Sequence, residues 1–466
     1  MSTFVVTADA ELARVAPPNL PLAPVNYNSQ YQEQLNNALR LYFNQLNKIV
    51  GQLMTTSTGL PISFPATSLD AFGRQRVSQP YTLFDSQNRY AADNQFDTST
   101  TGTGSSTFNT NQSSVSLSVT SGGVGSVIRQ TYRSFPYQPG KGLLVLATFQ
   151  MDTAADFSFV TQRVGYFNSD NGVFFQRNSG TRVNSFVLRT NTSGTPSDAR
   201  AVTQANWNGD KLDGTGASGL TLDLTHPQIL WMDFEWLGVG SVRCGFIIDG
   251  QYIVCHTFNT ANVYGTTVYM TTAILPVRYE ITSTAAATAS LVQICSSVMS
   301  EGGFEATSID HVARRTTILT GIGTGANFLP IVSIRMAPGR TGAVVLPNRV
   351  QFLPTTSQNY EVALLKNPTL TGATWAATVP SDSNVQYDVA ATAISSVGTI
   401  VQTDYVTATG SGGVGLTSAS TGYNWDLQLG TSVAGLTDIY TLGVRTVSGA
   451  TTGDGVGSIS FYDLTQ

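Results

Sequence analysis

Histidine and cysteine, the side chains best suited to metal binding or nucleophilic catalysis, are scarce in this sequence. The 466 residues include three of each, and the histidines, His226, His256 and His311, lie far apart. Their spacing matches no zinc motif. Cys255 and His256 are neighbours, so on a strand their side chains point to opposite faces and cannot form a catalytic pair. We therefore predict no catalytic residue, no metal and no cofactor, and we expect that the chain is not an enzyme.

Two oxygen-rich loops, residues 168–172 and 208–214, are the best candidates for a Ca²⁺ site. Neither matches a twelve-residue EF-hand loop, and the second contains Lys211. Asn, Asp and Gly are also the residues that tight turns require. This composition favours turns, with Ca²⁺ binding as the alternative.

Two tryptophans in polar loops, Trp207 and Trp425, are candidates for binding a glycan through an aromatic ring. Each lies among Asn and other polar residues, where a purely core role is less natural. The alternatives are a partly buried loop anchor and a contact between subunits. No pair of carboxylates stands out as suited to glycoside cleavage.

A heptad pattern in residues 28–54 predicts an oligomerising helix. Its apolar positions are spaced four and three residues apart: Leu35, Leu39, Tyr42, Leu46, Ile49 and Leu53. Leu at a positions and Ile at a d position disfavour two strands and favour three or four. The alternative is an amphipathic helix that lies on its own β domain, because Leu41 and Phe43 fall outside the stripe.

Composition excludes several classes of function. Charged residues make up 11% of the chain and the net charge is −5, without a basic stripe, so we expect no nucleic-acid binding. No apolar run is long enough to span a membrane. The first residues lack the basic and apolar regions of a signal peptide, so we expect synthesis in a reducing cytoplasm. Residues 1–27, rich in proline, read as an extended arm that attaches to a partner.

After the helix, the sequence predicts β structure throughout. In residues 229–236, Leu230 and Met232 alternate with Trp231 and Asp233, which is typical of a strand with one buried side. Short strands between Gly, Asn and Ser turns, without intervening helices, indicate antiparallel sandwiches. The first set of predicted strands is 142–149, 173–176, 183–189, 229–236, 243–248, 252–258 and 266–275. The second set is 331–336, 343–350, 360–366, 386–394, 400–409, 426–429, 438–448 and 457–463.

The predicted fold is therefore mainly β, with a short N-terminal coiled-coil helix followed by two antiparallel β-sandwich, jelly-roll-like domains. A pair of glycines at 302–303 marks the boundary between the sandwiches. The predicted segments are the arm at 1–27, the oligomerising helix at 28–60, the first sandwich at 61–305 and the C-terminal sandwich at 306–466.

Asp249-Gly250 predicts a two-residue hairpin turn. In that register Cys244 faces Cys255 across the two strands. Their pair is a hydrogen-bonded one with the wider Cα spacing. This spacing and the cytoplasmic synthesis favour two reduced thiols in the core, with a disulfide as the alternative.

Residues 68–86 resemble a segment of virion structural proteins from tailed bacteriophages, cyanophages included. Further stretches similar to this family are 137–141, 163–167 with 171–175, and 236–250, and residues 367–375 resemble phage fibre-like proteins more weakly. The resemblance implies a non-enzymatic virion component, on the head, tail or baseplate.

Arg74 and Arg76 alternate with other residues in this segment, so both guanidinium groups leave one side of an extended chain. Asp70 and Asp85 are candidate partners, which predicts an interface built from Arg74, Arg76 and Asp85. A solvated edge strand with loose surface pairs is the alternative.

These patterns lead to one main expectation. The chain is a homotrimeric fibre- or spike-like protein of a phage virion, attached to the tail or baseplate by its N-terminal region. Its expected partners are further copies of itself, other virion proteins and a host surface glycan. A capsid decoration or head-fibre protein and a glycan-binding receptor module are the alternatives.

Overall fold

The computed structural model describes residues 29–53, 79–152, 157–264, 267–305, 308, 310–323, 327–377, 383–407, 418–419, 425–447 and 451–465. It divides into two compact units, Met1–Val77 and Ser78–Gln466. Among the described residues, 53% are in strands and 7% in helix, which confirms the mainly β fold. The predicted arm, residues 1–27, lies outside the described residues, and the boundary between residues 305 and 306 stays a prediction.

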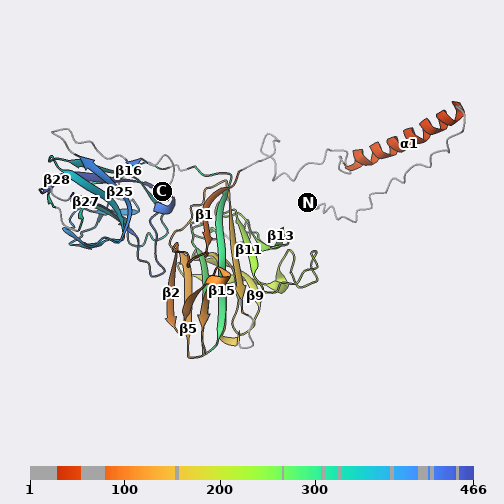
Figure 1. Cartoon of the computed structure of the whole chain (residues 1–466). Helices are drawn as coiled ribbons and strands as arrows, with labels where there is room; N and C mark the ends of the chain where they lie inside the picture. Colours follow the sequence, from red (N-terminus) through yellow and green to blue (C-terminus); the bar gives the residue numbers. More distant parts are fainter. Residues whose placement is uncertain are drawn as a thin grey trace. The chain divides into compact units, whose positions relative to one another are not determined.

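In the first unit, the predicted helix is confirmed as α1 (Ser29–Leu53) (Figure 1). The helix is continuous through the heptad stripe. Among the described residues, no helix is long and apolar enough to cross a membrane.

The second unit contains two β-sandwiches with antiparallel strand pairing. The eight-stranded sheet of the first sandwich runs in the order β13-β12-β11-β6-β15-β4-β3, with β1 paired to β15. Its strands are β1 (Tyr81–Gln87), β3 (Ser105–Asn109), β4 (Ser114–Val119), β6 (Gly142–Met151), β11 (Gln228–Phe234), β12 (Val242–Ile248), β13 (Gln251–Phe258) and β15 (Ala289–Glu301).

The seven-stranded sheet of the first sandwich runs in the order β10-β9-β8-β7-β14-β5-β2. Its strands are β2 (Phe96–Gly102), β5 (Gly125–Thr131), β7 (Val160–Phe167), β8 (Gly172–Arg177), β9 (Asn184–Thr190), β10 (Ser197–Thr203) and β14 (Val277–Ser283). Buried and less buried residues alternate along β6 and β5, because one face of each strand lies in the core. In β7, β8 and β9 nearly every residue is buried, so the outer face of the seven-stranded sheet is covered there.

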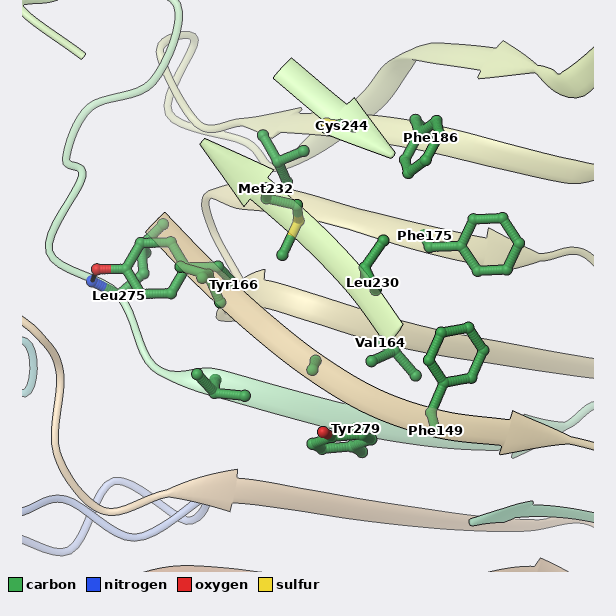
Figure 2. Close-up of a cluster of buried hydrophobic side chains, with 14 of the residues drawn as sticks. Phe149, Val164, Tyr166, Phe175, Phe186, Leu230, Met232, Cys244, Leu275 and Tyr279 are labelled. Carbon is green, nitrogen blue, oxygen red and sulfur yellow. Dashed lines mark hydrogen bonds between the residues drawn. The ribbon is translucent and has the colours of Figure 1, made fainter. Parts of the chain in front are cut away.

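An aromatic core joins the two sheets (Figure 2). Phe175 of β8 packs on Phe149 of β6 and Phe246 of β12, with ring centroids 5.8 and 5.3 Å apart. The buried Tyr166 hydroxyl donates to the carbonyl of Ala273 at 2.9 Å. Burial of these rings supplies most of the apolar contact that holds the sandwich together.

The second sandwich has a five-stranded and a six-stranded sheet, with an additional two-stranded pair. Phe352 packs on Tyr360 between the two larger sheets, with ring centroids 5.1 Å apart. The five-stranded sheet contains β16 (Asp310–Arg314), β17 (Leu319–Ile322), β19 (Val345–Pro354), β26 (Ser418–Ala419) and β28 (Gly453–Asp463). The six-stranded sheet contains β18 (Leu329–Met336), β20 (Asn359–Lys366), β22 (Ala376–Ala377), β23 (Val385–Asp388), β25 (Thr399–Thr407) and β27 (Ile439–Thr446), and the pair is β21 (Thr369–Thr371) with β24 (Ala393–Ser396).

Three of the predicted strands are wrong. Residues 267–275 form irregular chain, although Tyr269 and Met270 are buried there. Residues 425–427 form the short 3₁₀ helix η5 (Trp425–Leu427), and residues 386–394 are split between β23 and β24. In each case apolar residues are buried by loops rather than by a continuous ladder, which local propensity does not distinguish.

Candidate functional site

The predicted assembly residues are only partly described. Leu35, Leu39 and Tyr42 lie on one stripe of α1 and are less exposed than Leu41 and Phe43. The side chains of the other three seam residues, Leu46, Ile49 and Leu53, lie outside the described residues, as do Arg74 and Arg76. Asp85 is described, on β1, where its side chain is exposed. The predicted interface of Arg74 and Arg76 with Asp85 therefore stays a prediction.

Trp207 is a core residue of the first sandwich, with 3% of its surface exposed. It follows the short 3₁₀ helix η4 (Gln204–Asn206). Its ring packs on Phe186 at a centroid distance of 4.8 Å, and its indole N–H donates to the Val202 carbonyl at 3.2 Å. A ring enclosed in this way has no free face for a sugar, so Trp207 fits the loop-anchor alternative.

Trp425 is likewise enclosed, with 9% of its surface exposed. Its indole N–H donates to the Tyr81 hydroxyl at 2.9 Å, and its ring makes an edge contact with Phe304. Its carbonyl accepts a hydrogen bond from the Arg133 guanidinium at 2.7 Å. Trp425 therefore also fits the anchor alternative better than the glycan-binding one.

The histidines lie in three separate environments. His256 is buried, and its Nδ1 accepts the backbone N–H of Asn208 at 3.3 Å. Burial lowers the pKa of His256, so its ring is neutral at physiological pH. His226 is bonded to Asp223 at an exposed turn, and His311 stacks on Phe461. Among the described residues no group of three or more His, Cys, Asp or Glu is placed to hold a metal ion.

The hairpin at Asp249-Gly250 is confirmed, but the predicted facing of Cys244 and Cys255 is wrong. The register holds from Ile248 opposite Gln251 to Gly245 opposite Val254 and then shifts, so Cys244 lies opposite His256. Cys255 is the extra residue of a β-bulge.

Both of these cysteines are buried free thiols, as the favoured prediction had it, and not the disulfide that was its alternative. Burial raises the pKa of Cys255 to about 12 and that of Cys244 well above its usual value. Thiols held in this protonated form are poor nucleophiles and poor metal ligands. Cys244 and Cys255 therefore act as small core residues.

The two oxygen-rich loops are stabilised by their own backbones. The Asp210 carboxylate accepts the N–H groups of Leu212 and Ser218, at 2.9 and 2.6 Å. In the other loop the Asn168 side chain accepts the N–H groups of Asp170 and Asn171. These are the turn interactions that the sequence favoured, and they use the oxygens that a cation would need.

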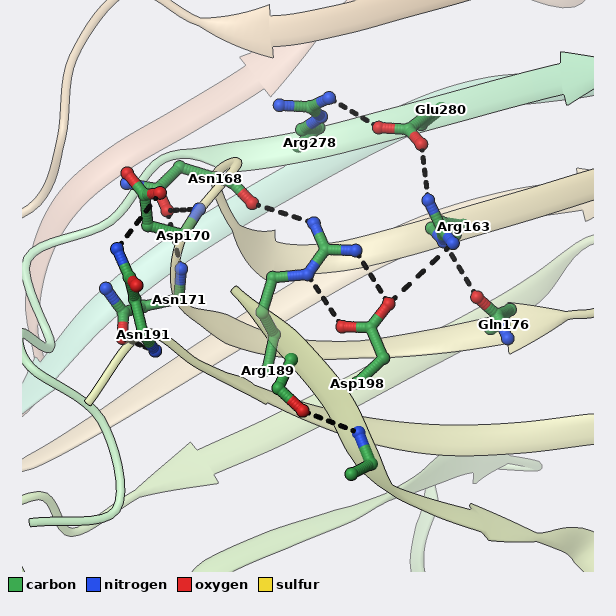
Figure 3. A network of polar contacts seen from close by, with 12 residues as sticks. Arg163, Asn168, Asp170, Asn171, Gln176, Arg189, Asn191, Asp198, Arg278 and Glu280 are labelled. Carbon is green, nitrogen blue, oxygen red and sulfur yellow. Dashed lines mark hydrogen bonds and ion pairs between the residues drawn. The ribbon is translucent and has the colours of Figure 1, made fainter. Parts of the chain in front are cut away.

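A chain of alternating charges crosses the outer face of the seven-stranded sheet (Figure 3). Glu280 of β14 lies between Arg278 and Arg163, and it accepts from Arg163 at 2.7 Å. Asp198 of β10 forms a two-point contact with Arg189 of β9, at 2.7 and 2.8 Å, and lies 3.8 Å from Arg163. We call these five residues the charged network.

The charged network covers two buried rings. Phe167 and Phe174 lie on the same outer face, with their ring centroids 4.4 Å apart. The guanidinium of Arg189 lies 5.1 Å from the Phe174 centroid, and that of Arg278 lies 5.3 Å from the Phe167 centroid. Planar guanidinium groups stack favourably on aromatic faces while their edges pair with carboxylates.

The network holds its carboxylates in the ionised state. Burial alone would raise the pKa of Glu280, but Arg278 and Arg163 together hold it below its usual value. Burial would likewise raise the pKa of Asp198, but Arg189 and Arg163 hold that pKa below its usual value. Each carboxylate is already paired, so the network is suited to rigidity rather than to proton transfer.

One pair of carboxylates lies on the outer face of the eight-stranded sheet. Glu301 Oε2 and Asp233 Oδ1 lie 3.1 and 3.5 Å from the point where a Cβ on Gly142 would lie. Arg243 Nε donates to Asp233 at 2.9 Å. Burial, together with the charge of Asp233, raises the pKa of Glu301. Sequence patterns did not single out this pair, because its members are 68 positions apart on β11 and β15.

A cavity of about 470 Å³ opens on the same outer face, lined on one side by β1. It lies where β15 changes partner from β4 to β1 and carries a bulge between Gln293 and Ser296. Leu146, Ile229 and Ile294 supply apolar lining, and Asp85 and Arg89 supply charge. The Asn88 side chain donates to the Ile294 carbonyl at 2.9 Å, which fixes the β1 end of the cavity to the bulge.

No protein-family model and no curated protein sequence matches the chain. Several solved structures share a β fold with part of it. A carbohydrate esterase of the Shiga toxin-encoding bacteriophage phi24B is 11% identical and covers 47% of this chain and 99% of its own, with a TM-score of 0.28. The CBM2 module of the evolved Dit protein of Lactobacillus casei BL23 phage J-1 is 5% identical and covers 49% and 99%, with a TM-score of 0.31.

Peanut lectin is similar in the same way: it is 9% identical and covers 48% of this chain and 98% of its own, with a TM-score of 0.28. The neighbours therefore include phage proteins and a lectin. At these identities and TM-scores, we draw no functional conclusion from the likeness.

Proposed function

We propose that the chain is a non-enzymatic structural protein of a tailed-phage virion, a homotrimer attached to the tail or baseplate through its N-terminal region. The observation that carries the assembly part is α1. The helix is continuous from Ser29 to Leu53, and a heptad stripe runs along it. The assignment to a virion rests on the resemblance of residues 68–86 to phage structural proteins.

The physical case for self-association begins with the length of α1. Twenty-five residues make a helix about 38 Å long, and an isolated helix of this kind is only marginally stable in water. A heptad stripe becomes stable when partner helices bury it. Leu39 at an a position and Leu35 and Tyr42 at d positions keep part of their surface exposed within the chain, which leaves that surface for other copies.

The non-enzymatic part of the proposal rests on how the chain uses its few charges. The charged network engages three arginines and two carboxylates in fixed pairs. Asp233 of the carboxylate pair is held by Arg243, and neither it nor Glu301 lines the cavity beside β1. A hydrolase needs such a pair to flank a bound substrate.

Sedimentation velocity of the full chain at micromolar concentration tests the assembly. We expect a trimer for the natural sequence, and a monodisperse monomer would contradict the proposal. Leu39→Asn places an amide in the seam and should dissociate the trimer, whereas Leu41→Asn changes an exposed residue outside the stripe and should leave it intact.

Imaging of labelled virions tests the location. Label at the tail or baseplate is the expected result, and label over the capsid would favour the decoration or head-fibre alternative. Both tryptophans of the glycan-binding alternative, Trp207 and Trp425, are buried, so glycan binding is not proposed as a second function.

A further inference from the structure

The outer face of the eight-stranded sheet is apolar where such a face is usually polar. Strand alternation sends Val145, Leu230 and Phe246 into the core, so their neighbours on each strand point outward. Those outward neighbours are mostly large and apolar. We call them the apolar face: Leu144, Leu146, Ile229, Trp231, Ile247, Tyr252, Val254 and Met299.

Strand register makes these residues one continuous surface. Leu146 lies opposite Trp231, and Trp231 lies opposite Gly245, which in turn faces Val254. In the next row, Ile229 lies opposite Ile247, which faces Tyr252. Residues directly opposite on paired strands share one face of a sheet. Met299 extends the surface on β15, opposite Leu144 of β6.

The indole of Trp231, at the centre of the apolar face, is hydrogen-bonded to the neighbouring backbone. The Trp231 N–H donates to the Ile253 carbonyl at 3.2 Å, and a Cβ on Gly245 would lie 2.8 Å from the indole nitrogen. Tyr252 makes an edge contact with the indole at 5.5 Å. The absence of a side chain at Gly245 therefore leaves the room that the indole occupies beside it.

The apolar face is open to solvent at three of its residues within the described part of the chain, whereas its central residue, Trp231, is 3% exposed. Tyr252 is 53% exposed, and Ile229 and Val254 are 37% exposed. Large apolar residues side by side at this exposure are unusual on a monomer and mark an interaction site. Tyr and Trp are also the residues that protein interfaces enrich.

The border of the face resembles the rim of an interface. The ion pair of Asp233 with Arg243 lies at one end, while Asp85 and Arg89 lie at the cavity at the other. Leu146 and Ile229 belong to both the face and the cavity. An apolar centre, a cavity beside it and a polar rim of both signs form the usual plan of a protein–protein contact.

We propose that the apolar face binds a second copy of this chain. The inference rests on the proposed function, because a trimer joined through α1 keeps its copies at a high effective concentration and lets a modest contact form. Along the sequence, β1, which lines the cavity, is the first strand after α1 among the described residues. The rim carries both signs of charge, which suits a partner with an equally mixed surface, such as another copy.

Photocrosslinking of the full chain tests the contact. Tyr252→p-benzoylphenylalanine places a photoreactive group on the face, and Tyr405→p-benzoylphenylalanine, at a still more exposed tyrosine of β25, is the control. The protein is assembled from a mixture of isotopically heavy and light chains. We expect crosslinked peptides that combine heavy and light chains for position 252 and none for position 405.

A second pair of variants measures the energetic share of the face. Tyr252→Lys with Val254→Lys should raise the dissociation constant of the trimer by about tenfold or more, whereas Tyr405→Lys should leave it unchanged. Circular dichroism checks that the variants keep their β structure.

The outcomes separate the two proposals. A trimer that gives no mixed crosslink at position 252 and tolerates the double lysine variant would overturn the apolar-face contact and leave the proposed function standing. A monomeric natural chain would overturn both. Crosslinks at position 252 that disappear in Leu39→Asn would confirm that the contact depends on α1.

Discussion

Both outer faces of the first sandwich carry apolar residues, but only one of the two faces covers them with charged side chains. On the seven-stranded sheet, Phe167 and Phe174 are covered by the chain's own arginines, which are neutralised in turn by Glu280 and Asp198. On the eight-stranded sheet, Tyr252 and Ile229 have no such cover within the described residues.

This difference between the two outer faces indicates which of them binds a partner. A face closed by a saturated ion-pair network gains rigidity and offers few unpaired groups. A face left apolar costs solubility unless something binds it. On the seven-stranded sheet the chain therefore covers its own apolar residues. On the eight-stranded sheet we expect a second copy of the chain to cover them.

The largest expected effect comes from opening the closed face. Glu280→Gln removes the charge between the buried Arg278 and the partly buried Arg163, and breaking a buried pair on one side costs about 3–5 kcal/mol. Urea unfolding of the purified chain measures the loss. Asp223→Asn, in an exposed pair with His226, is the control and should change stability far less, because solvent screens the pair. A loss from Glu280→Gln as small as the control's would show that the network is not what holds this face.

Distorting the open face should cost less. In Gly245→Ala, the new Cβ would lie 1.8 Å from the Ile253 carbonyl oxygen and would displace the Trp231 ring. Overpacking of this kind costs about 1–3 kcal/mol, and tryptophan fluorescence should shift as the indole leaves its position. Gly323→Ala, where a Cβ would meet only the Gly321 carbonyl oxygen at an ordinary contact distance of 3.9 Å, should have no such effect. An unshifted fluorescence spectrum in Gly245→Ala would contradict the described packing.

Acid should weaken the closed face in particular. The folded pKa values of Glu280 and Asp198 are lowered, so the unfolded state takes up protons first. The stability from these groups is complete at neutral pH and is lost as the pH falls through their folded pKa values. The urea midpoint should drop between about pH 5 and pH 3, more steeply for the natural chain than for Glu280→Gln. Parallel curves for the two proteins would contradict this assignment.

Thiol labelling compares the cavity beside the open face with the core. Cys295 is partly exposed and lines the cavity, whereas Cys244 and Cys255 are buried with raised pKa values. A disulfide reagent should modify Cys295 in the folded chain and the other two only after unfolding. Mass spectrometry identifies the modified peptide, and early labelling of Cys255 would mean that the hairpin is more open than described.

The smallest effect is expected at Glu301, on the border of the open face. Its folded pKa is raised by burial and by Asp233, so the neutral form is favoured and stability falls as the pH rises through that value. Glu301→Gln keeps a neutral side chain and should leave stability at pH 7 unchanged or raise it by about 0.5 kcal/mol or less, since the group is partly exposed. A clear loss of stability would mean that the charged form is the stabilising one.

Several features could be predicted because they depend on neighbours in the chain. The alternation in residues 229–236 correctly placed Leu230 and Met232 in the core and Trp231 on the opposite face, although Trp231 is buried there as well. The heptad stripe predicted α1, and Asp249-Gly250 predicted the hairpin turn. Helix and strand periods and two-residue turns are local properties, so the sequence carries them directly.

The pairing of Cys244 could not be predicted from neighbouring residues in the chain. The turn set the hairpin register only as far as Gly245, because the bulge at Cys255 depends on a distant loop. Gly209 donates its N–H to the Cys255 carbonyl, and Asp210 donates its own to the Val254 carbonyl, both at 2.9 Å. The two tryptophans were ambiguous for the same reason: a polar loop reveals nothing of the Phe186 ring that buries Trp207.

By itself, the sequence determined the mainly β fold, the helix and the inward or outward direction of many side chains. Only the tertiary structure decided which outward side chains meet. Arg163, Arg189 and Glu280 come from three strands, and Leu146, Trp231 and Tyr252 from three others. Alternation along one strand sets the face of each residue, but its neighbours are set by the order and register of strands far apart in the chain. The outer face of the seven-stranded sheet is therefore covered by the charged network, and that of the eight-stranded sheet remains apolar.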